Sequence, residues 1–480
     1  MIASAEPTDL SALKEELIGA CGAAFDKVLP PEGELPRQTL SEIESTAGGL
    51  SRLVGTLLIK NRLRADPLAR PDREFPCPKC GRRMRTQERE AKRTLETILG
   101  NVELVRPYCV CDACHFAAAP LDYALAIPRS GPSVSRRELI CHAATTARSF
   151  EKGTATLSHH SKLHMTPEGV RKHAEREGRK LVEASAKRVE ACFKNRGRTP
   201  RAPAQAVPLL VVTCDGGSVQ TRDKLQRWKE DKIGCVYDAE PLPEPRAPTA
   251  EKYRGAKART KTYVATMEPW ASLGPMLFVE ACIRGYLAAT AKLFISDAAN
   301  GIMALYAEHF PDAMLIIDWY HAAKHLSKCA KAAFPTSPAQ CTKWFETQKA
   351  RLWEGQVCQV IEAIRNESER VGRPPPKTPD TDPRVVLSRD LGYFSDHQEA
   401  MDYPAYRANG WPIGSGVAEG SVKQFGQRVK GSEQFWNVWG AEEMLALCAL
   451  QHSEDDRWAM YWKERSTPPA DAGRFYTSTH

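Results

Sequence analysis

Apolar residues recur at helical spacing in two places near the start of the chain. They are Leu10, Leu13, Leu17, Leu50, Leu53 and Leu57. Residues three and four positions apart share one face of an α-helix, so each series predicts an amphipathic helix. A proline-rich break at residues 29–36 lies between them. We therefore expect a helical region over residues 1–72, and it contains no chemical motif.

Short apolar runs dominate the middle of the chain. They lie at 207–213, 232–237, 262–267, 293–296 and 314–317. Runs of this length, bounded by turn residues, are typical of buried strands. The pattern turns helical at 335–406 and leads later into a helix at 417–430. We therefore predict an α/β core in two parts, 204–334 and 407–465, with a mostly helical insertion between them and a loose tail at 466–480.

Five of the 15 cysteines lie close together between residues 77 and 114. Cys77 and Cys80 form one C-x2-C pair, and Cys111 and Cys114 form another about 30 residues later. Two such pairs supply the four soft ligands of a structural Zn²⁺ site, and the sequence around Gly100 between them is typical of a hairpin turn. We predict a zinc ribbon over residues 73–128. Cys109 is a spare thiol and His115 an alternative ligand, and unrelated reduced thiols would be the other interpretation.

Positive charge is concentrated in one stretch of the chain. The whole chain has 67 Lys and Arg against 59 Asp and Glu, a formal net charge of +8. Residues 129–201 alone have 17 Lys and Arg against 7 Asp and Glu. Such a concentration favours a polyanionic partner, most often nucleic acid. A solvated helix surface would show the same charges.

The basic stretch also has a helical pattern. A short helix at 149–157 is followed by a connection and by a second helix that Thr166 and Pro167 open well. This order is typical of a helix-turn-helix, which we predict over residues 129–203. We assign Thr166, Arg171 and Lys172 to a DNA-binding surface, because Arg and Lys reach guanine edges and phosphates. Two ordinary surface helices are the alternative.

Three acidic residues are placed for metal chemistry. Asp215 and Asp297 end predicted strands, and Glu419 lies in the first turn of a helix. A cluster of carboxylates suits a pair of Mg²⁺ or Mn²⁺ ions in phosphoryl transfer. Lys423 and Lys430 share the helix face of Glu419 and would bind phosphate. Each aspartate is otherwise typical of a turn or cap residue.

Four segments carry a resemblance to a known family. They are TCDGG (213–217), LFISDAANGI (293–302), DWYHAAKHL (318–326) and PIGSGVAEGSVKQFGQRVKGSEQFW (412–436). Together they resemble a DDE transposase of a bacterial insertion sequence, of the ISKra type, over most of the chain. Asp318 and His321 resemble the D/C-x-x-H signature of Mutator-type and related transposases.

The resemblance implies an RNase H-like catalytic core with a zinc ribbon and a helix-turn-helix ahead of it. Asp215, Asp297 and Glu419 would be the catalytic metal ligands, and His321 would lie near them, although a structural histidine is an equal alternative. The activity would be metal-dependent cleavage at the element's ends followed by strand transfer. The partners would be terminal inverted repeats and target DNA, held by a homodimer or a larger assembly.

Arg428 and Trp436 are candidates for holding an unstacked base, because arginine and aromatic side chains favour such contacts. Trp436 is equally compatible with a core position. Two other functions fit the same residues. One is a domesticated or inactive protein that binds DNA without catalysis, and the other is a nuclease of the same fold without strand transfer.

Composition excludes several classes of protein. Apolar residues make up 42% of the chain and charged residues 26%, which is a globular balance. The longest apolar run covers about eight residues, whereas a membrane-spanning helix needs about 20. The first ten residues lack the basic and apolar segments of a signal peptide. We therefore expect a cytoplasmic, nucleoid-associated protein with no membrane partner.

Overall fold

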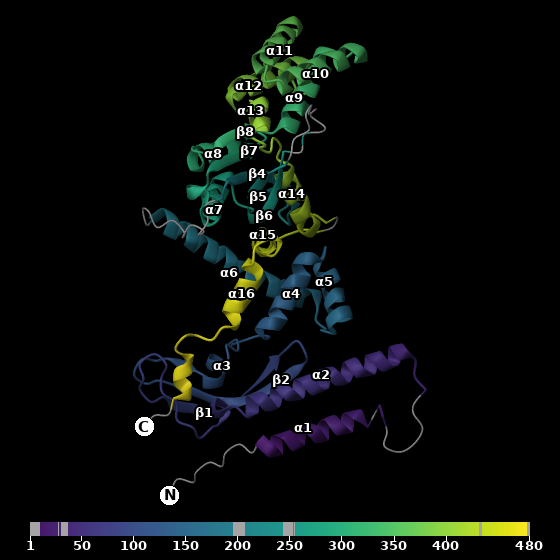
Figure 1. The fold of residues 1–480 in the computed structure, drawn as a ribbon. Helices are drawn as coiled ribbons and strands as arrows, with labels where there is room; N and C mark the ends of the chain where they lie inside the picture. Colours follow the sequence, from purple (N-terminus) through teal and green to yellow (C-terminus); the bar gives the residue numbers. More distant parts are fainter. Residues whose placement is uncertain are drawn as a thin grey trace. The chain divides into compact units, whose positions relative to one another are not determined.

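The computed structural model describes residues 10–26, 28–29, 37–194, 207–242, 253, 255–431 and 434–477 (Figure 1). The chain divides into two compact units. The first unit comprises Met1–Ala143, Gly153–Val170 and Trp458–His480, and the second comprises Ala144–Lys152 and Arg171–Arg457. Most of the proline-rich break lies outside the described residues.

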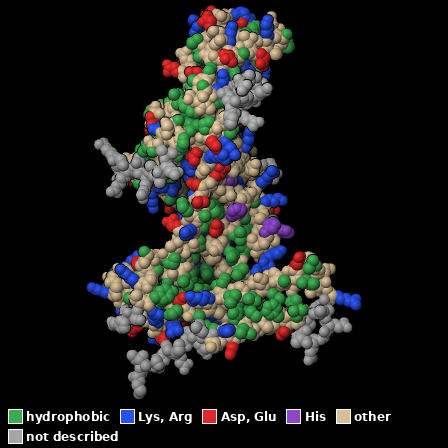
Figure 2. Space-filling view, viewed as in Figure 1, with side chains coloured by type: hydrophobic (Ala, Val, Ile, Leu, Met, Phe, Trp, Pro, Cys, Tyr) green, Lys and Arg blue, Asp and Glu red, His purple; other side chains and the backbone are tan. Residues whose placement is uncertain are grey.

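The first unit begins with the two expected helices, α1 (Leu10–Phe25) and α2 (Leu40–Arg64). Thr39 caps α2: its hydroxyl accepts from the Glu42 amide, and the Glu42 carboxylate accepts from the Thr39 amide at 2.7 Å. Such a reciprocal box satisfies two amides at the helix start. Apolar side chains of α2, including Leu53 and Leu58, remain exposed, and Figure 2 shows them gathered over this helix.

A three-stranded sheet follows, formed by β1 (Arg85–Glu96), β2 (Asn101–Val110) and β3 (Ala117–Ala118). The predicted hairpin between the two cysteine pairs is confirmed, with Glu96 opposite Asn101. The strands are antiparallel throughout. Short helices flank the sheet: η1 (Pro67–Ala69), α3 (Pro120–Ala124) and η5 (Ala472–Tyr476).

The expectation of a loose tail is wrong for the described part of residues 466–480. Phe475 is fully buried in a core with Phe75 and Leu121 of the same unit. Asp471 accepts a hydrogen bond from the Tyr123 hydroxyl at 2.8 Å and pairs with Lys79 at the same distance. The composition of the tail is polar, so its single deeply buried aromatic ring is what fixes it.

Four helical segments cover the basic stretch. They are α4 (Val134–Thr146), α5 (Phe150–Thr156), the π-helical turn η2 (Leu157–Ser161) and α6 (Pro167–Lys194). The short helix and the second helix therefore lie where the sequence predicted them. The Thr166 hydroxyl accepts from the Gly169 amide at 3.1 Å, so Thr166 is the N-cap of α6.

The second unit is built on a five-stranded mixed sheet. Its strands are β4 (Leu209–Gln220), β5 (Trp228–Pro241), β6 (Ala256–Thr266), β7 (Ala291–Ser296) and β8 (Met314–Ile317). Their order across the sheet is β6-β5-β4-β7-β8. β4, β5 and β6 pair antiparallel, whereas β7 and β8 run parallel to β4. All five strands follow the predicted apolar runs.

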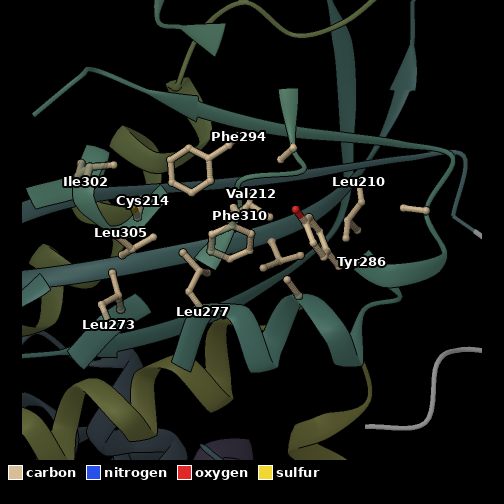
Figure 3. Close-up of a cluster of buried hydrophobic side chains, with 14 residues drawn as sticks. Leu210, Val212, Cys214, Leu273, Leu277, Tyr286, Phe294, Ile302, Leu305 and Phe310 are labelled. Carbon is tan, nitrogen blue, oxygen red and sulfur yellow. The ribbon is translucent and has the colours of Figure 1, made fainter. Parts of the chain in front are cut away.

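Helices cover both faces of this sheet. α7 (Trp270–Ile283) and α8 (Asn300–His309) pack on the face that carries Val212 and Cys214, and Figure 3 shows the resulting apolar cluster around Phe294 and Phe310. α14 (Gly416–Val429) packs on β4 and β5, and α15 (Val438–His452) packs on β6. Side chains alternate along a strand, so Asp215 lies on the face opposite to Cys214.

The predicted insertion is helical. The insertion follows α9 (Trp319–Ala333). Its helices are α10 (Pro338–Trp353), α11 (Val357–Val371), α12 (Pro383–Asp396), η4 (Gln398–Ala400) and α13 (Tyr403–Ala408). α16 (Arg457–Ser466) follows α15. The mixed α/β class is thus confirmed. None of the helices in the described part of the chain has the length and apolar character needed to cross a bilayer.

Candidate functional site

The four cysteines of the two pairs come together in the first unit. The Sγ atoms of Cys77 and Cys114 are 3.5 Å apart, as are those of Cys80 and Cys111, and all four lie within 4.8 Å of one another. Four thiolates at about 2.3 Å from a tetrahedral Zn²⁺ are about 3.8 Å from each other. The cluster therefore has the size and the donor set for a structural zinc ion.

The two cysteine pairs have the same backbone conformation. In the first, the Gly81 amide donates to the Cys77 carbonyl at 2.9 Å, and in the second the His115 amide donates to the Cys111 carbonyl at 2.8 Å. Gly81 and His115 both have left-handed backbones, with φ of 76° and 57°. His115 therefore occupies the turn position that Gly81 fills in the other pair, and it is not among the clustered ligands.

Hydrogen bonds shared among the four clustered thiols lower the pKa of Cys111 and raise that of Cys114 to about 12, so pKa alone does not separate the cluster from Cys109. The amides of Cys114 and Ala113 point at the Cys111 sulfur and lower its pKa to about 7, which favours the thiolate that binds metal. Burial instead raises the pKa of Cys109, whose sulfur lies 3.7 Å from the Thr86 hydroxyl. Cys109 is a buried apolar residue beside the cluster.

In the second unit, acidic residues line up along one edge of the sheet. Thr213 of β4 is paired with Ile295 of β7. Two residues further along each strand, Asp215 and Asp297 therefore lie level with each other. The last residue pair between β7 and β8 lies one residue before Asp297 and Asp318. These two aspartates therefore also lie opposite each other. Neighbouring strands are about 4.8 Å apart, so three acids from distant parts of the sequence are neighbours.

Asp215 differs from its expected place in one respect. β4 does not end there, because Asp215 pairs with Ile233 and the strand continues through the two glycines that follow. Burial raises the pKa of Asp215, and the negative charges of Asp297 and Glu419 raise it further, against the Gly216 amide and His321. These interactions bring the three acids that the sequence singled out into one electrostatic cluster.

Asp318 is an acidic residue of this edge that the sequence analysis did not assign as a ligand. The signal was present, since Asp318 follows a predicted strand as Asp297 does. Together with His321 and Glu419 it forms a group whose ligand atoms lie within 4.8 Å of one another. The three residues come from the start of α9 and the first turn of α14.

The carboxylate of Asp318 is already saturated with hydrogen bonds. Its Oδ1 accepts from the amides of Tyr320 at 2.6 Å and His321 at 3.2 Å. Its Oδ2 accepts from the amide of Ser415 at 2.8 Å and from the Ser415 hydroxyl. A carboxylate offers about four acceptor positions. Asp318 therefore joins the start of α9 to the start of α14, and we regard it as a positioning residue.

Burial would raise the pKa of Asp318, but the His321 ring and Ser415 hold it below its ordinary value. The same carboxylate raises the pKa of His321, whose Nδ1 lies 3.2 Å from Asp318 Oδ2, and the charges of Asp297 and Glu419 add to this effect against partial burial. The raised pKa favours the protonated form of His321, a basic group grouped with Asp318 and Glu419.

Glu419 and the two predicted lysines extend this cluster along α14. Lys423 is exposed, with its Nζ 3.8 Å from Glu419 Oε2. Lys430 lies at the other end of the helix, 3.9 Å from Asp231 on β5. Asp231 is fully buried, and a side chain on Gly217 would overlap both members of this pair. Gly217, two residues after Asp215, thus makes room for a buried acid and a lysine.

Arg428 and Trp436 do not lie where a DNA contact requires them. They are 2% and 7% exposed. The Arg428 guanidinium lies 4.2 Å from the ring centre of Phe150 and 5.1 Å from that of Trp436, and its Nε donates to the Ala144 carbonyl. The Trp436 indole donates to the Val429 carbonyl. Both side chains therefore contribute to packing inside the second unit, which corrects the prediction that they contact DNA.

The remaining predicted DNA contacts lie on α6. Lys172 is exposed, and Arg171 pairs with Glu175 one turn later at 2.5 Å. Thr166 is committed to the N-cap. Arg179, exposed on the same helix, pairs with the buried Glu443 at 2.7 Å. Part of the positive charge of this stretch is therefore neutralised within the protein.

The sequence was also compared with known protein families. The profile of the uncharacterised protein family UPF0236 matches residues 80–466. The chain belongs to this family. No curated protein matches it.

The UPF0236 match covers both candidate sites almost completely. Cys80, Cys111 and Cys114 lie inside it and Cys77 lies three residues before its start. All residues of the acidic cluster lie inside it as well. The UPF0236 segment thus contains the acidic cluster and three of the four clustered cysteines.

Proposed function

We propose that this protein is a DNA transposase that cleaves the ends of an insertion sequence and joins them to target DNA. The observation that carries the proposal is the convergence of Asp215, Asp297 and Glu419. These residues are more than 80 residues apart in sequence, and the charges of Asp297 and Glu419 raise the pKa of Asp215. The resemblance to ISKra-type DDE transposases assigns catalysis to these same three residues.

The donor set of the acidic cluster fits hard divalent cations. Asp215 is partly buried beside two other carboxylates, and His321 is the positive group among the interactions that shift its pKa. Such a cluster gains most from an added cation. Asp215, Asp297 and Glu419 would hold Mg²⁺ or Mn²⁺, and the bound ions would stabilise the attacking and leaving oxygens of a phosphodiester.

The architecture of the second unit supports an RNase H-like core. Three antiparallel strands are followed by two strands parallel to the first, and Asp215 lies on the first strand. The acidic edge is where the carboxyl ends of β7 and β8 lie beside the middle of β4. The helical segment between Asp297 and Glu419 corresponds to the insertion that the resemblance implies.

In this proposal the chain's own residues bind and orient the DNA. Lys423 is exposed one turn from Glu419, where it would contact a phosphate near the scissile bond. Lys172 and its basic surroundings on α6 would bind the terminal repeats. Water would attack the phosphorus, the bond to the 3′-oxygen would break, and the freed 3′-hydroxyl would attack target DNA in the second step.

The cysteine cluster would hold a structural Zn²⁺ in this protein. Its four thiols occupy a volume that suits one tetrahedral ion, and two of them are buried in the core of the ribbon. We further propose that at least two copies assemble on DNA, because transposition requires two ends to be held together. Apolar side chains exposed on α2 provide surface for such contacts.

The test is a cleavage and strand-transfer assay on DNA that carries the element's own ends. Wild type with Mg²⁺ should give joined products, and EDTA should abolish them. Glu419→Gln should lower the rate by at least about 100-fold, in the range seen when a group that stabilises transition-state charge is removed. Glu362→Gln is the matched control, because Glu362 is also a helical glutamate paired with a basic residue one turn on.

The outcomes separate the three functions. Cleavage without joined products would indicate a nuclease. Specific binding of the ends without any cleavage would indicate a DNA-binding protein that has lost catalysis. Activity that survives both Glu419→Gln and Asp215→Asn would place the active site elsewhere in the chain.

A further inference from the structure

A groove lies between α9 and α10, one residue from the acidic cluster. Its wall is formed by Trp319, Tyr320, Ala323, Lys324, Ser327, Phe345 and Lys349. Its volume is about 360 Å³, near the lower end of the range for ligand pockets, about 300–1,000 Å³. A groove of this size accommodates one or two planar groups.

We propose that this groove binds unpaired bases of single-stranded DNA beside the site of phosphoryl transfer. The proposal rests on the proposed function for its biological setting, and it adds the part of the substrate that the acidic cluster does not contact. Nothing in the proposed chemistry itself requires this groove.

The first support is the combination of side chains. Tyr320 is 60% exposed and presents its ring to solvent, and Trp319 beneath it is buried against Trp353. Phe345 faces the groove from α10 with the Lys349 ammonium 5.5 Å from its ring centre. Aromatic rings beside positive charges are the arrangement that binds single strands, because every base offers a face for stacking and every linkage a negative charge.

The second support is the charge at the rim. Lys324 is exposed, and no ion pair involves it among the residues that the structure describes. Lys349 lies 3.8 Å from Glu346, an acid with its side chain 59% exposed. One lysine is thus free for a phosphate and the other has only a long, exposed contact, which a phosphate can replace. This charge favours a nucleic acid over an acidic or purely apolar peptide.

The third support is the position of Tyr320. Its amide donates to Asp318, the residue that also holds His321 and the start of α14. Its ring packs on Gly414, where a Cβ would lie 2.8 Å from it. The groove is therefore fixed to the frame of the acidic cluster. A DNA strand that extends from the acidic cluster would meet Tyr320 first. Arg428 and Trp436 are buried, so they are not accessible for stacking on a base.

The test uses the full-length zinc-loaded protein, with no Mg²⁺ or Mn²⁺ added, and a 12-nucleotide oligothymidine with one central 2-aminopurine, whose fluorescence falls when it stacks. Wild type should bind this probe and quench it. Tyr320→Ala and Phe345→Ala should each weaken binding by about 5-fold or more and reduce the quenching, as expected for the loss of a stacked base. Tyr320→Phe should retain both.

Matched controls address folding and charge. Trp439→Ala removes an aromatic side chain that is 68% exposed outside the groove, and it should leave the probe signal unchanged. Lys324→Gln should weaken binding more than Lys331→Gln, which removes the same charge from the same helix. Zinc content and the melting temperature of each variant verify that it is folded.

Several results would overturn the inference. These are the absence of quenching by wild type, quenching that survives in both Tyr320→Ala and Phe345→Ala, and an equal loss of binding to a 12-base-pair duplex, which would mean that the groove acts on backbone charge alone. A failure of the proposed function would be detected separately, in the cleavage assay. Probe binding is measured without added Mg²⁺ or Mn²⁺, and Asp215→Asn should still bind the probe.

Discussion

The cysteine cluster of the first unit and the acidic cluster of the second unit are assembled in opposite ways. Each cysteine pair is a local turn, in which the first and second thiols are three residues apart and the backbone repeats the same hydrogen bonds. The acids come instead from β4, from the residues that directly follow β7 and β8, and from α14. The ribbon site is thus mostly encoded in short segments, whereas the acidic site exists only once the sheet has formed.

The two clusters also differ in how they affect the stability of the protein when no cation is bound. Thiols can remain neutral, so four of them tolerate proximity until a cation arrives. The acids repel one another, and burial and charge raise the pKa of Asp215. We infer that the cysteine cluster serves stability, whereas the mutual repulsion of the acids lowers it.

The largest effect should follow from loss of the cysteine cluster. Cys111→Ser removes a buried thiol of the proposed zinc site, and structural zinc contributes about 10–16 kcal/mol to the folding of small zinc domains. We expect loss of stoichiometric zinc and rapid hydrogen exchange over residues 73–128. Elemental analysis and exchange mass spectrometry measure these changes. Cys109→Ser is the matched control, since Cys109 is equally buried, and full zinc content in Cys111→Ser would refute the site.

The next largest effect concerns two neighbouring acids on the sheet edge. Asp318→Ala should destabilise the second unit by about 3 kcal/mol, because it leaves the amides and hydroxyl that Asp318 satisfies without a partner. Asp297→Ala should cost less than about 1 kcal/mol, since Asp297 accepts only from the Ala299 amide within the described residues. Chemical denaturation measures both. Equal losses would contradict a positioning role for Asp318.

Two histidines of the second unit have pKa values that are shifted in opposite directions, one by neighbouring charge and the other by burial. His321 beside the acids has a raised pKa, whereas burial lowers the pKa of His452 to about 4. The unfolded chain binds a proton at His452 below about pH 6.5 while the folded chain does not, so stability should fall by about 2 kcal/mol between pH 7 and pH 5. His452→Leu should flatten this dependence in denaturation curves. An unchanged slope would show that other groups cause it.

The smallest effect should have the opposite sign. Asp215→Asn removes a carboxylate whose charged form is disfavoured by burial and by Asp297 and Glu419. We expect the melting temperature of the second unit to rise by about 2–4 °C, which corresponds to about 1 kcal/mol for a domain of this size. Calorimetry without divalent cations measures it. A lower melting temperature would indicate that Asp215 has a structural role like that of Asp318.

Much of the fold could be predicted from the chain because its signals are local. The apolar runs of β4, β5, β6, β7 and β8 and the helical spacing of α1, α2 and α14 each depend on a few neighbouring residues. The tail was predicted wrongly because its contacts are not local: Phe475 packs against Phe75, which lies 400 residues earlier. Polarity near a chain end says little when one ring provides the attachment.

The sequence by itself identified the four cysteines that could hold zinc, because their spacing within each turn already brings two sulfurs together. It also identified Asp215, Asp297 and Glu419 as candidates. Only the tertiary structure decided which acids share an edge, because strand register is set by packing across the whole sheet. The tertiary structure also decided the environment of each of these side chains. Arg428 and Trp436 are buried in the core, the acceptor positions of Asp318 are filled by hydrogen bonds, and Tyr320 is exposed to solvent. Burial is a property of the assembled layers, and no local pattern specifies it.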